Sequence, residues 1–143
     1  MPTTLRRLRR LVLLPALALA SACENSVSIE PDVLAGSYVA TSFVVTQTGQ
    51  PSVDVLARGG SLLINIAAND SVSGLLVLPD GLPGAQAGTA DMKGKIVRRS
   101  DGTFVFDQEA NTFIEALIWQ QFTDALVSTS FLVNTQFQIT LRK

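Results

Sequence analysis

The sequence predicts an all-β fold, an eight-stranded antiparallel up-and-down barrel with one or two short helical turns. Three observations favour this fold. From Gly36 onward, short runs rich in β-branched and aromatic residues are separated by glycine, proline, asparagine and aspartate. Within several runs apolar and polar residues alternate, as they do in strands with one buried face. Eight short strands with mostly tight connections can close into a barrel, which removes exposed sheet edges.

The first half of the barrel begins with residues 37–46, which are rich in the valine, threonine, tyrosine and phenylalanine that strands favour. Turn residues end this strand, and residues 53–58 are expected to form one helical turn. The second and third strands, residues 61–67 and 71–79, flank Asn69-Asp70 and form a hairpin. Because strand side chains alternate, one face of each is expected to carry Leu62, Ile64 and Ile66, or Val72, Gly74, Leu76 and Leu78.

The second half follows a loop rich in proline, glycine and alanine. The fourth and fifth strands, residues 91–98 and 103–107, are joined by an Asp101-Gly102 turn. Phe104 and Phe106 share one face of the fifth strand. The last three strands are residues 117–122, 126–133 and 136–142. In the final strand, apolar and polar side chains alternate without interruption.

Residues 112–122 allow two interpretations. Thr112 and Glu115 have the spacing of a capping box, and a helix could continue through the apolar residues that follow. The later part of the segment is rich in β-branched and aromatic residues, however, and strand-like runs flank it on both sides. We favour a helical turn at residues 112–115 followed by a strand.

The N-terminal segment is organised as a secretory signal. Four arginines precede an apolar run of residues 11–20, and small residues lead to Cys23, the only cysteine in the chain. This segment resembles the signal of bacterial lipoproteins, with Ala20 at the position where leucine is commonest. The resemblance implies that residues 1–22 are removed and that Cys23 is lipidated. Alternatives are a plain secretory signal and an uncleaved anchor, although the apolar run is too short to span a bilayer, which takes about 20 residues.

A lipidated cysteine would attach the protein to a membrane through a short tether, residues 23–34. The implied location is the bacterial cell envelope. Glu24, rather than aspartate, follows the cysteine, which by resemblance to the known sorting scheme implies the outer membrane. Residues 35–143 then form the folded domain.

Composition excludes several classes of function. The signal would remove four of the eleven basic residues and leave twelve acidic ones, so a nucleic-acid partner is not expected. The chain has no histidine, the commonest general base and metal ligand. We therefore expect no enzyme, no metal and no cofactor. A pair of carboxylates remains the only candidate acid–base chemistry, and most carboxylates that could supply it lie at predicted turns, where acidic residues are common. They are Asp107, Glu109, Glu115 and Asp124.

Three short motifs occur in a consistent order. Gly36-Ser37-Tyr38 opens the first strand, Thr123-Asp124-Ala125 lies between the sixth and seventh strands, and Arg142 ends the last strand. Over residues 35–143 the chain resembles the lipocalin-like small barrels of bacterial lipoproteins, with Tyr38 replacing the family's tryptophan. The resemblance implies that Arg142 packs over the ring of Tyr38 and that the barrel interior can hold a ligand.

Two hypotheses for function follow. In the first, the barrel is a binding module for a small apolar ligand, with Trp119, Phe104 and Phe106 as candidate lining residues. In the second, it is a structural or interaction protein that docks on an unidentified partner, because several strands are apolar on both faces, among them residues 131–133. A core filled by large side chains would favour docking, because only a roomy interior holds a ligand.

Overall fold

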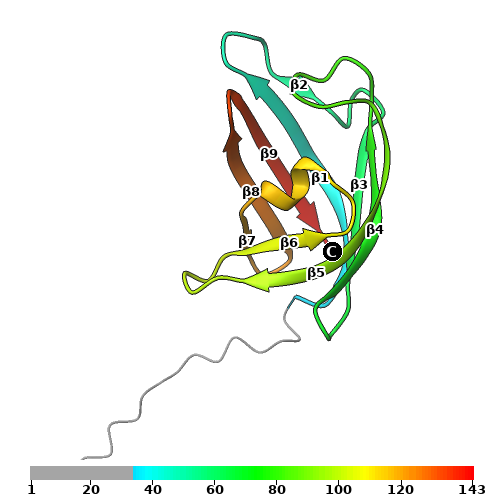
Figure 1. The fold of residues 1–143 in the computed structure, drawn as a ribbon, viewed down its shortest axis with the longest axis vertical. Helices are drawn as coiled ribbons and strands as arrows, with labels where there is room; N and C mark the ends of the chain where they lie inside the picture. Colours follow the sequence, from blue (N-terminus) through cyan, green and yellow to red (C-terminus); the bar gives the residue numbers. More distant parts are fainter. Residues whose placement is uncertain (1–33) are drawn as a thin grey trace, which may run out of the picture.

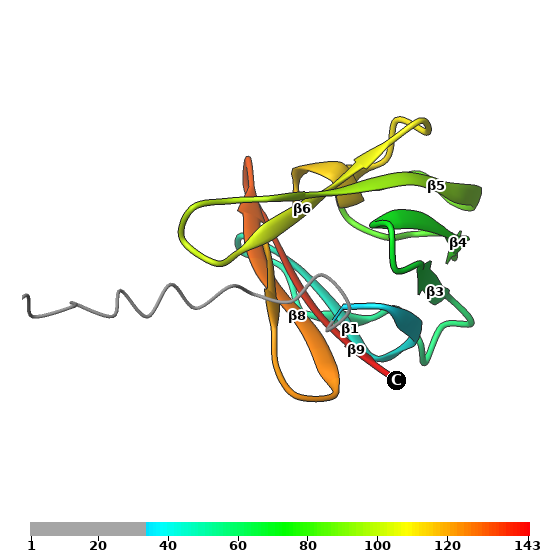
Figure 2. The same ribbon diagram turned by 90° about the horizontal axis from the view of Figure 1, so that it is seen from below.

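The computed structural model describes residues 34–143, whose strands form a closed antiparallel barrel (Figures 1 and 2). The predicted signal and the predicted lipidation site, Cys23, lie outside the described residues. The strands are β1 (Gly36–Gln47), β2 (Val53–Asp54), β3 (Ser61–Ile66), β4 (Ser71–Leu78), β5 (Gly88–Arg98), β6 (Phe104–Gln108), β7 (Trp119–Gln121), β8 (Ala125–Leu132) and β9 (Thr135–Arg142). One turn of 3₁₀ helix, η2 (Phe113–Ala116), precedes β7.

Eight strands make the barrel wall. From β3 to β9 each strand pairs with the next along the chain, and β1 pairs with β3 on one side and β9 on the other. This order confirms the predicted eight-stranded antiparallel barrel. The join between β6 and β7 is the narrowest, a single pair formed by Phe104 and Trp119.

The expected helical turn at residues 53–58 is wrong in its first part. Val53 and Asp54 form β2, which pairs with Val45 and Val44 of β1. This part of β1 extends past the residues that pair with β3, so β2 covers an edge that would otherwise be exposed. The chain turns only afterwards, where the carbonyl of Val55 accepts hydrogen bonds from the backbone of two later residues.

The two-part interpretation of residues 112–122 is confirmed, since η2 is followed by β7. The capping box, in contrast, is not formed. Thr112 occupies the N-cap position in an extended conformation, but its side chain makes no capping hydrogen bond. Its hydroxyl donates instead to Oε1 of Gln108 over 3.1 Å.

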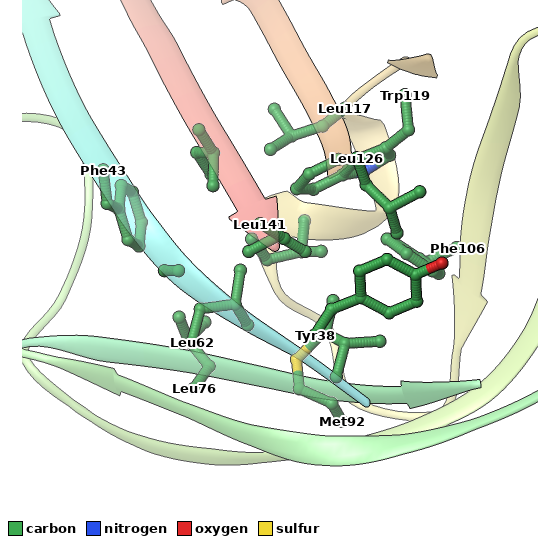
Figure 3. Close-up of a cluster of buried hydrophobic side chains, with 14 of the residues drawn as sticks. Tyr38, Phe43, Leu62, Leu76, Met92, Phe106, Leu117, Trp119, Leu126 and Leu141 are labelled. Carbon is green, nitrogen blue, oxygen red and sulfur yellow. The ribbon is translucent and has the colours of Figure 1, made fainter. Parts of the chain in front are cut away.

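The core lies inside the barrel, on the inward face of every strand of the wall. Tyr38, Phe106 and Trp119 enter the same interior from three different strands (Figure 3). The core also includes Leu34, which is only 1% exposed although the predicted boundary places it in the tether. The largest fully buried side chains are Trp119, Tyr38, Phe43, Phe104, Phe106, Phe137, Leu34, Leu62, Ile64, Leu76, Met92 and Ile114.

Gly94 in β5 is required by the close approach of β6. A Cβ atom at this position would overlap the carbonyl oxygen of Asp107. We expect Gly94→Ala to lower the free energy of unfolding by about 1–3 kcal/mol, because backbone atoms must move to admit the methyl group. Urea denaturation followed by circular dichroism measures the change. Ser73→Ala, at an exposed position of β4, is the control, and equal midpoints for the two variants would contradict the expectation.

Candidate functional site

A pocket of about 320 Å³ opens at one end of the barrel. It lies where β4 ends and β5 begins, and the loop between them forms one wall. The lining residues are Leu76, Leu78, the segment Gly84–Ala90, Asn111, Thr112 and Phe113. We call this the mouth pocket. Sequence reasoning treated the glycine- and alanine-rich part of it as a connecting loop and assigned it no role.

The mouth pocket lies at the opposite end of the barrel from the N-terminal end of β1. Gly36 pairs with Ile66 at the end of β3, whereas the start of β3 at Ser61 pairs with Val77, next to Leu78. Figure 1 shows the same arrangement, with the start of β1 at the lower end and the β4–β5 loop at the upper end. The start of β1, two residues after the first described residue Leu34, therefore lies at the end of the barrel away from the pocket.

Aromatic side chains form the base of the mouth pocket. The ring of Phe113 stacks on Phe137, with centroids 4.5 Å apart and an angle of 19° between the planes. Phe43 lies beside Phe113 at 6.2 Å. Both Phe43 and Phe137 are buried, so the barrel is filled beneath the pocket. The site is thus a shallow apolar pocket above a packed core.

A polar group also lies near this end of the barrel. Gln108 ends β6, and its Oε1 atom accepts the hydrogen bond from Thr112, a lining residue. Its Nε2 atom is buried and has no hydrogen-bond partner among the described residues. The neighbourhood of the pocket therefore combines apolar walls with a few polar atoms, as small-molecule sites commonly do.

The three residues predicted to line a ligand site face inward, as expected, but they pack on one another. The rings of Phe104 and Phe106 lie 5.5 Å apart, and those of Phe106 and Trp119 lie 5.3 Å apart, both edge to face. All three side chains are at most 2% exposed. The interior is thus filled by large side chains, which counts against a ligand inside the barrel and leaves the mouth pocket, lined by other residues, as the place where a ligand could bind.

The lipocalin-like motif residues lie at the opposite end of the barrel, but the cation over the ring of Tyr38 is not the predicted one. Tyr38 is buried and its hydroxyl donates to the carbonyl of Leu34 over 3.0 Å. The cation over its ring is Lys143, with Nζ 5.4 Å from the centroid, and not Arg142. Arg142 is on the outer face of β9, so it pairs with Asp124 at 2.8 Å.

The remaining motif residues lie at the start of a strand and in a turn. Gly36 begins β1, and Thr123 is exposed next to Asp124 in the connection between β7 and β8. The backbone carbonyl of Asp124 also accepts a hydrogen bond from the N–H of Lys143. These contacts join the first and last strands to the β7–β8 turn, so the motif residues act here as a structural closure of the barrel.

Three of the four candidate carboxylates lie in ion pairs with basic side chains, among them Asp124 with Arg142, and the fourth, Glu115, is exposed in η2. Asp107 lies 3.7 Å from Lys95, and Glu109 lies 3.2 Å from Lys93, both in exposed ion pairs on the outer face of β5 and β6. Hydrogen bonds from the side chain and backbone of Thr103 lower the pKa of the exposed Asp101. Such a bond pattern stabilises a turn.

Residues 34–143 contain no cluster of three or more side chains suited to bind a metal ion. Within the same range, no helix has the length and apolar character needed to cross a bilayer. Searches of protein-family models, curated proteins and solved structures give no match to this chain. The function of the site therefore rests on its own geometry.

Proposed function

We propose that the protein is a lipid-anchored lipoprotein of the bacterial outer membrane whose barrel binds a small apolar ligand in the mouth pocket. It is a binding module and not an enzyme. The observation that carries the proposal is the mouth pocket itself, an apolar hollow in a barrel that is otherwise filled. Its volume is at the lower end of the range of about 300–1,000 Å³ that is typical of ligand pockets.

The position of the pocket agrees with a lipid anchor on Cys23. The tether joins the barrel at Leu34, and the mouth pocket opens at the other end. A ligand would then enter from the side of the barrel that faces away from the anchoring membrane. The eleven residues from Glu24 to Leu34 can extend about 36 Å at most, so the barrel stays close to the bilayer surface.

The size of the pocket limits both ligand and affinity. The packed rings of Phe113 and Phe137 prevent a chain from passing deeper into the barrel. Burial of about eight methylene groups at about 0.8 kcal/mol each would contribute about 6 kcal/mol, which corresponds to a dissociation constant of tens of micromolar. A medium-chain fatty acyl group is therefore a suitable probe.

We expect decanoate to bind saturably, with a dissociation constant of tens of micromolar or weaker, in isothermal titration calorimetry. Leu78→Asp places a carboxylate in the pocket and should weaken binding at least tenfold, because the acyl chain would then lie against a charged group that also repels the carboxylate of decanoate. Leu75→Asp is the matched control, since it makes the same change in the same strand at a position exposed on the outer face.

Two results would contradict the ligand hypothesis. One is equal binding by the Leu78→Asp and Leu75→Asp variants, which would place the probe elsewhere on the protein. The other is the absence of any heat of binding together with no ligand recovered by mass spectrometry from the natively purified protein.

A further inference from the structure

One wall of the barrel is nearly free of charge. From Ala116 to Leu141 the sequence contains a single charged residue, Asp124, and this stretch includes β7, β8 and all of β9 except its last residue, Arg142. Apart from Arg142, the outward-facing residues of these strands and of the two positions that flank β7 are Ile118, Gln120, Phe122, Val127, Thr129, Phe131, Gln136, Gln138 and Thr140. We call them the uncharged wall. The outer face of β5 and β6, in contrast, carries Lys93, Lys95, Asp107 and Glu109.

The uncharged wall also exposes large apolar side chains. Phe131 is 61% exposed, Phe122 is 55% exposed and Ile118 is 41% exposed. At the β8–β9 turn next to this wall, Val133 is 98% exposed and has a φ of 56°. A β-branched residue adopts this conformation at a cost of roughly 1–2 kcal/mol. Surfaces that are depleted of charge and enriched in aromatic residues are typical of the centre of a protein interface.

An open strand edge lies beside these side chains. The pairing of β8 with β7 reaches only Ser128, whereas the pairing of β8 with β9 continues to Leu132. The segment Thr129–Leu132 therefore has a ladder partner on one side only; on the other side its contact is the hydrogen bond that the N–H of Ile118 donates to the hydroxyl of Ser130 over 3.0 Å. It borders a groove of about 350 Å³ on the outside of the barrel, which Ala116, Ile118 and Gln120 line on the other side.

We propose that the uncharged wall binds a second copy of this chain, with the Thr129–Leu132 edges of the two copies paired antiparallel about a two-fold axis. A two-fold axis brings a segment against itself in the antiparallel direction, which is the geometry of an antiparallel strand pair. The pairing would satisfy the open backbone groups of β8 and enlarge the sheet, as in other cases of strand addition.

The charge distribution favours a second copy over other occupants. Residues 34–143 carry seven basic and nine acidic side chains, so two copies repel each other weakly overall. If two copies meet through the uncharged wall, no like charges come into contact and no charged side chain loses its hydration in the interface. The cation on this face of β9 is Arg142, which is paired with Asp124 at the end of β8 away from Thr129–Leu132, so the wall offers little electrostatic attraction to an anionic bilayer surface. The proposal does not depend on the mouth pocket, which other residues line.

The mass of the full chain in detergent solution tests the proposal by light scattering. We expect a dimer for the unmodified chain and a monomer for Thr129→Arg, with dimerisation weakened at least 100-fold, because two added cations would meet near the axis. Ser73→Arg is the matched control. It makes the same change at an exposed residue of β4, on another part of the barrel surface, and it should stay dimeric. Circular dichroism confirms that both variants are folded.

Cross-linking in membranes provides a second measurement. A short bis-maleimide should join two copies of Thr129→Cys and should not join copies of Ser73→Cys. Two results would overturn the proposal. One is an unmodified chain that is monomeric in detergent at every concentration of a dilution series, including the highest. The other is a dimer that Thr129→Arg leaves intact. A lipid surface would be the occupant instead if Thr129→Cys gave no cross-link and were shielded from a membrane-impermeant maleimide only in membranes.

Discussion

Trp119→Ala is expected to lower the free energy of unfolding by about 3–5 kcal/mol, the typical cost of removing a buried tryptophan. Trp119 is fully buried and packs against Phe106 in the core. It also forms, with Phe104, the single pair that joins β6 to β7. Loss of the indole would therefore leave a cavity at the narrowest join in the barrel wall. Urea denaturation followed by far-ultraviolet circular dichroism measures the effect.

Two neighbouring substitutions calibrate this result. Ile118→Ala removes a side chain that is 41% exposed on the outer face of the same strand, and it should cost about 1 kcal/mol or less. Trp119→Phe should cost clearly less than alanine, because it keeps an aromatic ring and removes the indole N–H, which is buried without a partner among the described residues. An alanine variant as stable as Ile118→Ala would show that the join does not depend on the indole.

Cys23→Ser is expected to release the protein from the membrane fraction or to stall its processing. Cys23 is the only cysteine in the chain, so no second thiol of the same chain can pair with it. An acyl anchor requires this sulfur, and serine cannot replace it. Fractionation of cells followed by immunoblotting measures the change, and Ser28→Ala, a small substitution in the same tether, should leave the distribution unaltered.

Intact-mass analysis of the mature protein gives the direct test of the anchor. The expected species begins at Cys23 and carries acyl chains on that residue. A mature chain with an unmodified cysteine thiol would show that the signal is a plain secretory one. The ligand and dimer hypotheses would be unaffected by that outcome, because both depend on the barrel alone.

The parts of the fold that follow from local pattern could be predicted from the sequence. Alternation in Leu62, Ile64 and Ile66 identifies the inner face of β3, and Asp101-Gly102 identifies a turn. Each of these features is determined by residues that are close to one another in the sequence. Alternation did not decide whether Trp119 or its neighbours Ile118 and Phe122 face inward, because both faces of that strand are apolar; the structure buries Trp119 and exposes the other two.

The features that the sequence did not reveal depend on distant contacts. β2 forms because β1 extends beyond the residues that pair with β3 and leaves an edge for β2 to cover. The sequence of β2 itself gives no sign of this pairing. The ring of Tyr38 is covered by Lys143 because the strand alternation turns Arg142 outward. The mouth pocket arises from the loop after β4 and the segment around Phe113, two regions that meet only when the barrel closes.

The pairing of β1 with β9 determines when this chain can finish folding. Val39 pairs with Arg142 and Gln47 pairs with Thr135, so the ladder that closes the barrel joins residues from the two ends of the domain. Most other ladders connect strands that are consecutive in the chain and can form soon after each hairpin is synthesised. Closure must wait until β9 has been synthesised. Until then, the edges of β1 and β8 that later pair with β9 stay exposed, and the nascent sheet is open along both.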